Sequence, residues 1–313
     1  MYSPLTNNTG IENRVGIVLL NWNNSLETIS CIDQIRKINI NNTPLIVVVD
    51  NASQDPYLEK LQEEESIHLI KLNMNRGFSA GINIGIRWLL LQGCQYILVL
   101  NSDVTLSPDF LSQLLSVMDD DKDKKIGIIS PKIRYFSPSN QIWFAGGKFH
   151  FPRILGEMVG IGEVDNGQYD KMRSIDFVTG CCMLIRSEVF DHVGFFDEQF
   201  FFYHEDVDFC LRTLKAGYQI WIYPQAIIWH NVSSSTREIP YRRAYLYVSG
   251  RWVFFRKHIR GFRWIPVMLW EIIRYLREIF SALIRWDITY IQVYNQAVID
   301  GFRGKIDTLK TNH

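Results

Sequence analysis

Apolar residues along the chain gather in short continuous runs, and segments with helical spacing follow them. Residues 14–21 (RVGIVLLN) form the first such run, and in residues 26–38 an isoleucine recurs at every third position from 29 onward. A run that is apolar throughout is typical of a buried strand, whereas a repeated apolar stripe predicts an amphipathic helix. Further strands are predicted at 44–50, 67–72 and 96–100, and further helices at 79–91 and 108–118. Strands that alternate with helices predict βαβ units, and therefore an α/β fold with a mostly parallel sheet.

The pattern is less regular in the second half of the chain. Residues 126–176 are rich in glycine and aromatic residues and predict an irregular segment. Beyond it, apolar runs predict strands at 177–185, 219–223 and 226–229, with a helix at 205–216 that Gly217 ends. We expect one α/β domain at residues 14–236, preceded by a flexible N-terminus at 1–13 and followed by a helical extension at 237–313.

The extension contains a long helical pattern with two unlike faces. Residues 265–299 predict one long helix, and no run in it approaches the roughly 20 apolar residues that a membrane crossing requires. Its apolar face holds Ile265, Leu269, Ile272, Leu276, Ile279 and Leu283. Tryptophan and tyrosine among arginines suit a helix at a membrane surface, with contact through residues 241–300. Packing on the body or on a twin subunit, as in a homodimer, is the alternative, and both stay open.

Charge is distributed unevenly, although its sum is zero. The chain has 313 residues, of which 47% are hydrophobic, and it holds 33 basic and 33 acidic residues. Residues 231–313 contain 14 of the basic residues but only 6 of the acidic ones. A basic tail predicts an anionic partner, a lipid surface or a phosphorylated acceptor. We expect no nucleic-acid partner.

Cysteine use and the first residues bear on location. The five cysteines are an odd number without CxxC spacing, which predicts buried thiols in a reducing compartment and no zinc site. The polar start MYSPLTNNTG lacks the apolar core of a secretory signal. We therefore expect a cytoplasmic protein that can also associate with the inner face of the plasma membrane.

Chemically useful side chains follow the predicted strands. Asn21, Asp50 and Asp103 lie near the carboxyl ends of strands, where ligands bind in parallel sheets. Farther along, acidic residues follow a run of aromatics at 195–212, and His230 follows another apolar run. Carboxylates held against apolar surface are costly unless they are paired, bind metal or transfer protons. The pattern therefore predicts a reaction centre.

Seven segments occur in an order that resembles a known family. They are IVLLNWNNSLETISCIDQI, VVVDNAS, NRGFSAGINIGI, LNSDV, VTGCCMLIR, FFDEQFFFYHEDVDFCLRTLKAGY and IWHNVSSST. Together they resemble the family 2 glycosyltransferases, in particular the bacterial rhamnosyltransferase-like branch, over residues 15–236. No single segment is specific, but their order and spacing are. The resemblance implies a GT-A fold, a nucleotide-sugar donor, a divalent cation and inversion at the anomeric carbon.

The resemblance also implies a metal site. Asp103 stands where the family's DxD motif has its metal ligand, although Asn101 replaces the first aspartate and gives NSD. His230 fits the position of the histidine that completes the site in related enzymes. Mg²⁺ or Mn²⁺ is the expected cofactor, since hard cations bind carboxylates and neutralise a diphosphate leaving group.

The remaining roles are carried over position by position. Asp206 corresponds to the catalytic base that accepts the proton of the attacking hydroxyl. If a helix begins at Glu205, Asp208 is rotated away from Asp206, and we expect it to serve helix or loop structure. Asp50 resembles the acid that accepts the N3–H of uracil or thymine, which both bases share, so UDP and dTDP stay open. The implied donor-binding residues are Asn21, Asn23, Asp50, Arg76, Asn83, Asn101 and Ser102. The implied acceptor-binding residues are Glu205, Trp143, Thr179 and Gly180.

The expected function is transfer of a sugar, such as rhamnose, from a UDP- or dTDP-sugar to a saccharide or lipid-linked saccharide in surface polysaccharide synthesis. One alternative is a nucleotidyltransferase. That class needs a glycine-rich loop with Arg or Lys after the first strand, and NWNNSLET contains neither glycine nor a basic residue. The other alternative is a non-catalytic sugar-nucleotide-binding scaffold. Its only support is Asn101, which replaces an aspartate of the motif.

Overall fold

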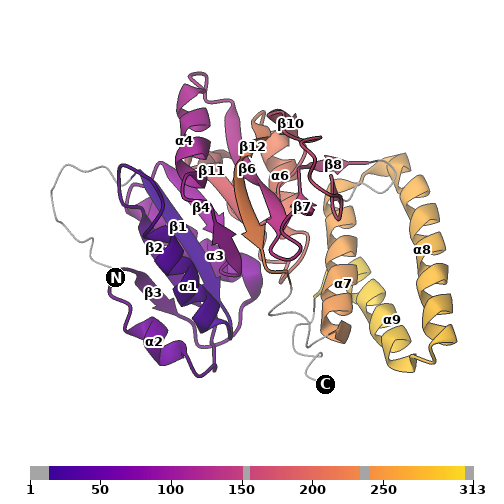
Figure 1. The fold of residues 1–313 in the computed structure, drawn as a ribbon. Helices are drawn as coiled ribbons and strands as arrows, with labels where there is room; N and C mark the ends of the chain where they lie inside the picture. Colours follow the sequence, from indigo (N-terminus) through magenta and orange to yellow (C-terminus); the bar gives the residue numbers. More distant parts are fainter. Residues whose placement is uncertain (1–13, 151–155, 233–239, 307–313) are drawn as a thin grey trace.

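The protein is represented by a computed structural model that describes residues 14–150, 156–232 and 240–306. A central sheet with flanking helices forms the body, and the C-terminal helices stand together on one side of it (Figure 1). In the described ranges the main sheet has the strand order β10-β12-β6-β11-β4-β1-β2-β3, with β5 paired to β12 and β7 to β6.

The N-terminal strands are parallel, as the alternating pattern predicts. They are β1 (Val15–Asn21), β2 (Leu45–Asp50), β3 (His68–Lys71) and β4 (Tyr96–Leu100). The helices between them are α1 (Ser25–Ile35), α2 (Leu58–Gln62) and α3 (Gly77–Leu91). Asn21 and Asp50 are register partners, so the carboxyl ends of β1 and β2 lie side by side.

The second half of the sheet mixes strand directions. Strand β11 (Cys182–Arg186) runs antiparallel to both β4 and β6 (Ile126–Tyr135), and β12 (Gln219–His230) is parallel to β6. The shorter strands are β5 (Val104–Leu106), β7 (Ile142–Phe144), β8 (Gly147–Phe149), β9 (Gly156–Met158) and β10 (Arg173–Ile175). The helices of this half are α4 (Phe110–Asp120), α5 (Glu188–Val193) and α6 (Glu205–Lys215).

The prediction of an irregular segment at 126–176 was wrong at its beginning. Strand β6 occupies the centre of the sheet, although Gly127 and Pro131 interrupt its apolar run. Pro131 is tolerated because it lies between the part of β6 that pairs with β11 and the part that pairs with β7. The strand predicted at 177–185 begins only at Cys182.

The two strands predicted at 219–223 and 226–229 are one strand. Strand β12 stays paired with β6 along its length, with a register shift between Tyr223 and Ile227. Extra residues at this bulge look like a turn in the sequence, but the ladder resumes beyond them. The strand therefore ends at His230.

The single helix predicted at 265–299 was also wrong. After α7 (Pro240–His258) and the 3₁₀ turn η1 (Gly261–Arg263), the chain forms α8 (Trp264–Ile284) and α9 (Ile288–Arg303). Trp286 takes a positive φ of 56°, and the Asp287 carboxylate accepts a hydrogen bond from the Tyr290 N–H at 2.9 Å, which begins α9. None of the helices in the described ranges combines the length and apolar character that a membrane crossing requires.

Candidate active site

The ends of β1 and β2 are tied together by buried polar side chains. The Asn21 amide donates to the Asp50 carboxylate and to the Ser53 hydroxyl, each at 3.0 Å. Its carbonyl oxygen accepts from the Thr28 hydroxyl at 2.9 Å. Asn21 and Asp50 are almost fully buried, so they hold the loops after both strands in place. Neither residue lines the neighbouring pocket.

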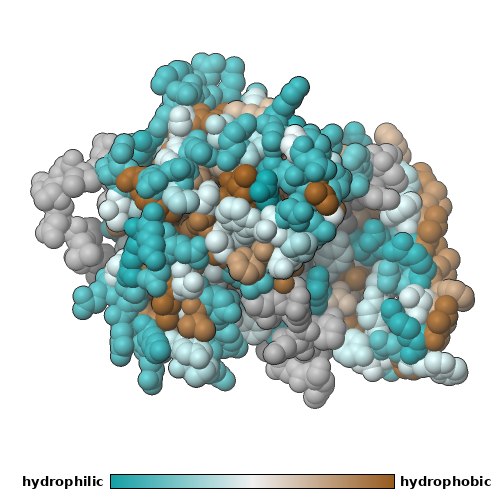
Figure 2. All heavy atoms as spheres, in the orientation of Figure 1, coloured by the Kyte–Doolittle hydropathy of each residue, from teal (hydrophilic) through white to brown (hydrophobic). Residues whose placement is uncertain are grey.

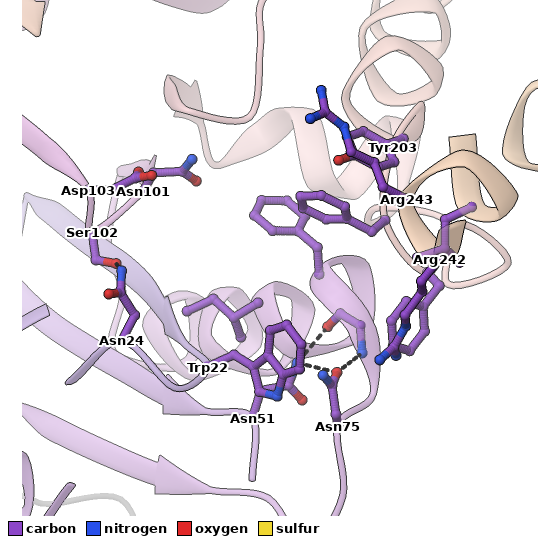
Figure 3. A pocket seen from close by; sticks show the side chains of 16 residues that line it. Trp22, Asn24, Asn51, Asn75, Asn101, Ser102, Asp103, Tyr203, Arg242 and Arg243 are labelled. Carbon is purple, nitrogen blue, oxygen red and sulfur yellow. Dashed lines mark hydrogen bonds between the residues drawn. The ribbon is translucent and has the colours of Figure 1, made fainter. Parts of the chain in front are cut away.

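The pocket opens beyond these strand ends and is bounded by three parts of the chain. Figure 3 shows Trp22, Asn51 and Asn75 on one part of its wall, with Arg242 nearby. Asn24, Ser102 and Asp103 form another part, and the segment around Tyr203 a third. The full lining is Leu20, Trp22, Asn24, Asn51, Asn75, Gly77, Phe78, Asn101, Ser102, Asp103, Phe201, Phe202, Tyr203, Arg242, Arg243 and Leu246.

Asp103 and His230 are in direct contact beside this pocket. Asp103 follows the end of β4, and His230 ends β12, which pairs with β5 at that point. The His230 Nε2 lies 3.1 Å from an Asp103 carboxylate oxygen. The ring of Trp143 meets the His230 ring edge-on at a centroid distance of 4.4 Å. Two residues 127 positions apart are thus brought into one small site by the sheet.

Asp206 is joined to the same end of the sheet through β11. The Asn101 N–H donates to the Cys181 carbonyl at 2.9 Å, so the beginning of β11 lies beside the NSD segment. The neighbouring Gly180 N–H donates to one Asp206 carboxylate oxygen at 3.0 Å, and the Val207 N–H donates to the other at 2.8 Å. The carboxylate is therefore held in a fixed orientation.

The neighbouring carboxyl groups of Glu205 and Asp206 both have raised pKa values. Burial raises the pKa of Asp206 above its ordinary value, although the N–H donors of Gly180 and Val207 oppose the shift. Burial raises the pKa of Glu205 well above the ordinary range, and the charges of Asp206 and Asp208 add to this. One Glu205 oxygen has no hydrogen-bond partner among the described residues. Raised carboxyl pKa values in a cleft are typical of proton-transfer sites.

Asp208 has a different environment. It forms ion pairs with Arg212 and Lys257 and a hydrogen bond with His258, the last two from α7. Burial raises the pKa of Asp208, but the His258 hydrogen bond and the positive charges of Arg212 and Lys257 outweigh burial and lower it to about 2. Asp208 therefore joins α6 to α7, in agreement with a structural role.

A strained turn precedes the acids. Tyr203 and His204 both have positive φ, 73° and 71°, which non-glycine residues adopt at a cost of about 1–3 kcal/mol each. The buried His204 ring contacts the Tyr247 carbonyl oxygen of α7 at 2.9 Å, and burial lowers the pKa of His204 to about 4. Gly250 allows this approach, since an added Cβ would lie 3.0 Å from the His204 ring.

Helix α7 also supplies positive charge to the pocket. Arg242 lies near the rings of Trp22 and Phe201, 5.8 Å and 5.5 Å from the respective centroids. Burial lowers the pKa of Arg242, and no carboxylate among the described residues offsets this. Arg243 lines the pocket beside it. Two guanidinium groups at a pocket that also holds Asp103 suit a ligand with several negative charges.

A match to a family model identifies the protein's family. The model described as glycosyltransferase like family 2 matches residues 13–255. The chain belongs to glycosyltransferase family 2. The dTDP-rhamnosyl transferase RfbF of Shigella flexneri is 28% identical to this enzyme over 279 residues, covering 83% of this chain and 86% of that one. The N-acetylglucosaminyl-diphospho-decaprenol L-rhamnosyltransferase of Mycobacterium tuberculosis is 24% identical over 247 residues, covering 72% and 79%.

A solved structure shows the fold. The mannosyltransferase PcManGT from Pyrobaculum calidifontis, in complex with GDP-Man and Mn²⁺, has a TM-score of 0.55 and 13% identity to this glycosyltransferase, covering 96% of this chain and 78% of that one. The predicted GT-A fold and the predicted resemblance to rhamnosyltransferases are confirmed. The family match supports a sugar-transferring enzyme over a nucleotidyltransferase or a scaffold.

The residues of the glycosyltransferase fit a divalent cation with two protein ligands. Neighbouring ligands in an octahedron with bonds of about 2.1 Å lie about 3 Å apart. The Asp103 oxygen and the His230 Nε2 have this separation, at 3.1 Å. Among the described residues no group of three or more His, Cys, Asp or Glu side chains could hold a metal. A cation at this pair would therefore take its other ligands from the substrate and water.

The structure separates the other predicted residues into those at the pocket and those away from it. Asn101 and Ser102 line it. Asn83 does not: its buried amide binds the backbone of Phe196 and the carboxylate of Glu198, so it holds the segment before α6. Exposed Arg76 lies 3.6 Å from Glu198 and also stays outside the lining.

The remaining predicted residues lie around the site. Asn23 is exposed, with a positive φ of 52°, and accepts from the Gln54 N–H at 2.7 Å. Trp143 covers His230, and the Thr179 hydroxyl accepts from the Cys181 N–H at 3.4 Å, next to Gly180. Contacts of these residues with donor or acceptor stay predictions.

Sequence reasoning missed several residues that line the pocket. Trp22 and Asn24 lie in the segment NWNN at residues 21–24, where the sequence pattern indicated only Asn21 and Asn23. The Asn51 side chain donates to the side-chain oxygen of Asn75 at 2.9 Å and accepts from the Arg76 N–H, thereby fixing the loop before α3. The pair Arg242-Arg243 had a visible signal, the excess of basic residues after residue 230.

Proposed function

We propose that this family 2 glycosyltransferase transfers rhamnose from a dTDP-sugar, with a UDP-sugar as the alternative donor, to a saccharide or lipid-linked saccharide. The contact of Asp103 with His230 at one edge of a pocket that Arg242 also lines is the observation that carries the proposal. Two relatives that cover most of the chain are named for rhamnosyl transfer, one of them from dTDP-rhamnose, which supports this choice of donor.

The donor's diphosphate is proposed to lie between the NSD segment and α7. Asp103 and His230 would hold Mg²⁺ or Mn²⁺, and the imidazole ligand favours Mn²⁺. When bound, the cation neutralises negative charge on the leaving diphosphate. Arg242 and Arg243 would neutralise part of the same charge from the opposite wall. Their contribution compensates for Asn101, which supplies no charge where the motif has a carboxylate.

The nucleoside is proposed to occupy the end of the pocket near β1 and β2. Trp22 offers an aromatic face, and the amides of Asn51 and Asn75 form the wall beside it. Asp50 precedes Asn51 in the chain, and one of its carboxylate oxygens accepts from the Asn21 amide and the Ser53 N–H. The second oxygen of Asp50 is proposed to accept the N3–H of the pyrimidine.

Asp206 is proposed to act as the general base. It takes the proton from the attacking acceptor hydroxyl while the new bond from that oxygen to the anomeric carbon forms. The bond from the anomeric carbon to the diphosphate breaks at the opposite side, and its electron pair leaves with the nucleoside diphosphate, which inverts the carbon. The N–H groups of Gly180 and Val207 orient the Asp206 oxygens for this transfer. Glu205 and Trp143 are proposed to help position the acceptor.

The acceptor is proposed to be a saccharide carried on a lipid diphosphate, used at the inner face of the plasma membrane. The Mycobacterium tuberculosis relative is named for a diphospho-decaprenol acceptor, and residues 231–313 are basic. Both features support an acceptor with negative charge near a membrane surface.

A transfer assay tests the proposed function. The full chain is incubated with Mn²⁺, dTDP-rhamnose or UDP-sugars, and a synthetic N-acetylglucosaminyl-diphospho-polyprenol. We expect a rhamnosylated lipid whose new linkage, by NMR, has the anomeric configuration opposite to that of the donor. A retained configuration would contradict the role of Asp206, and failure with every sugar nucleotide would contradict the proposed reaction.

A further inference from the structure

The outer face of α8 carries a row of large apolar side chains. We call Ile265, Leu269, Ile272, Leu276, Phe280 and Leu283 the α8 outer face. Each of these side chains is at least 50% exposed, and Phe262 and Trp286, which lie just beyond the two ends of α8, are more than 80% exposed. Figure 2 shows hydrophobic residues along the edge of the molecule that α8 occupies in Figure 1. A continuous apolar surface of this kind marks an interaction site.

Helix α8 packs its charged face against the neighbouring helices and exposes its apolar face, whereas most amphipathic helices bury the apolar face. Its charged residue Glu271 is 4% exposed and pairs with buried Arg251 of α7 at 2.9 Å. Glu278 faces α9, where it accepts from the Tyr290 hydroxyl at 3.2 Å. Because the charged side chains hold the inner side of α8 against its neighbours, the apolar stripe is fixed on the outside.

The border of the α8 outer face is positively charged. Arg260 and Arg263 are exposed at its beginning, and Arg285 is exposed at its end. The carboxylates of this segment point elsewhere, since Glu271 and Glu278 are paired as described. The third, Asp287, begins α9 by accepting from the Tyr290 N–H. An apolar stripe bordered by arginines, with aromatic residues at both ends, is complementary to an anionic lipid surface.

A second copy of the chain fits this face less well. A two-fold contact would place the α8 outer face against itself, and the bordering arginines would then meet one another. The carboxylates that could pair with them are already bound to Arg251, Arg277 and the Tyr290 hydroxyl. The distribution of charge therefore favours a bilayer over a homodimer.

We propose that the α8 outer face docks the enzyme on an anionic lipid bilayer, with α8 lying in the plane of the interface. Helix α9 packs on α7, and α7 carries Arg242 and Arg243 into the pocket. Docking through α8 therefore fixes the direction in which the pocket faces the bilayer. The docking surface does not depend on the proposed reaction; only its use to meet a lipid-linked acceptor rests on the proposed function.

Co-sedimentation with vesicles tests the proposal. The full chain is mixed with vesicles of phosphatidylcholine plus phosphatidylglycerol, or of phosphatidylcholine alone. We expect binding to the anionic vesicles that weakens with added salt. The double substitution Leu276→Glu and Phe280→Glu should reduce the bound fraction about tenfold or more, since it places charge in the apolar stripe. Leu91→Glu is the matched control, because Leu91 is 80% exposed on α3, and it should bind like the wild type.

Charge is tested separately by Arg263→Glu with Arg285→Glu. This pair should remove the preference for anionic vesicles. All of these variants should keep the wild-type unfolding temperature, because the changed side chains are exposed, and this separates a docking defect from misfolding.

Three outcomes would overturn the proposal. The first two are a wild type that binds neither kind of vesicle and a double variant that binds as well as the wild type does. A wild-type dimer that ignores vesicles and becomes a monomer in the double variant would make the face a homodimer interface instead. Donor binding, measured on the same proteins, is independent: its absence would contradict the proposed function and leave the vesicle result to decide docking.

Discussion

At the residue scale, the two oxygens of Asp206 are held by different backbone N–H groups, from Gly180 and Val207. Asp206→Asn removes the proton acceptor while keeping the shape of the side chain. We expect turnover to fall by about 10² or more, with donor affinity unchanged within about twofold. Initial rates and calorimetry measure the two quantities. Asp123→Asn, at a largely exposed position, is the control and should change neither. A variant of Asp206 with wild-type turnover would remove this residue from the role of base.

The pH dependence of activity follows from the same residue. Burial raises the pKa of Asp206 in the folded enzyme, and a base must be deprotonated to act. Activity is therefore lost as pH falls through this raised pKa, and we expect the acid limb of kcat/KM to lie above about 3.9, the ordinary aspartate value. A pH–rate profile measures it. An acid limb at or below the ordinary value would mean that Asp206 is not buried as described or is not the base.

At the element scale, Asp208 joins α6 to α7 through Lys257 and His258. Asp208→Asn removes the carboxylate from the enclosed His258 ring and from half-buried Lys257, which keeps its ion pair with Asp197, so we expect the free energy of unfolding to fall by about 1–3 kcal/mol. The wild type should show the matching pH effect. Since the folded-state pKa of Asp208 is lowered to about 2, its contribution is complete above the unfolded value of about 3.9 and is lost as pH falls towards 2. Urea unfolding at pH 7 and pH 3 measures both, and equal stability of variant and wild type would contradict this account.

The contact between α7 and the strained turn makes a second prediction at this scale. A Cβ at Gly250 would lie 3.0 Å from the His204 ring and 3.3 Å from the Tyr203 carbonyl oxygen. Gly250→Ala should therefore reduce turnover, and Gly250→Val should reduce it further, because the turn that precedes the acids must move. Donor and acceptor kinetics measure the effect. Equal turnover in both variants would show that the turn tolerates displacement.

The elements that the sequence predicts correctly are those whose burial is uniform. The run RVGIVLLN and its successors are covered on both faces, so their apolar residues are continuous, and β1, β2 and β4 lie where the pattern places them. Strand β6 escapes prediction because Pro131 falls where the strand changes partners. The break between α8 and α9 occurs at Trp286, which has a positive φ. The helical pattern of apolar residues continues across this position, so the sequence does not reveal the break.

At the scale of the whole molecule, part of the candidate site could be predicted from sequence. Asp103, Asp206 and His230 stand at ends of elements, where a local pattern indicates chemistry, and the sheet brings Asp103 to His230. The role of Asn83 could not be predicted from a local pattern, because its amide donates to the backbone of a segment more than 100 residues away. The approach of Arg242 depends on how α7 packs, which no local pattern predicts.

The central claim is that Asp103 and His230 form a metal-dependent site for the diphosphate of a nucleotide sugar. Calorimetric titration of dTDP- and UDP-sugars, with Mn²⁺ and with EDTA in its place, tests this claim most directly on wild-type enzyme and on Asp103→Asn. We predict that one sugar nucleotide binds in the presence of Mn²⁺, and that both EDTA and Asp103→Asn weaken its binding about tenfold or more. Binding that neither EDTA nor the substitution changes, or no binding of any sugar nucleotide, would contradict the claim.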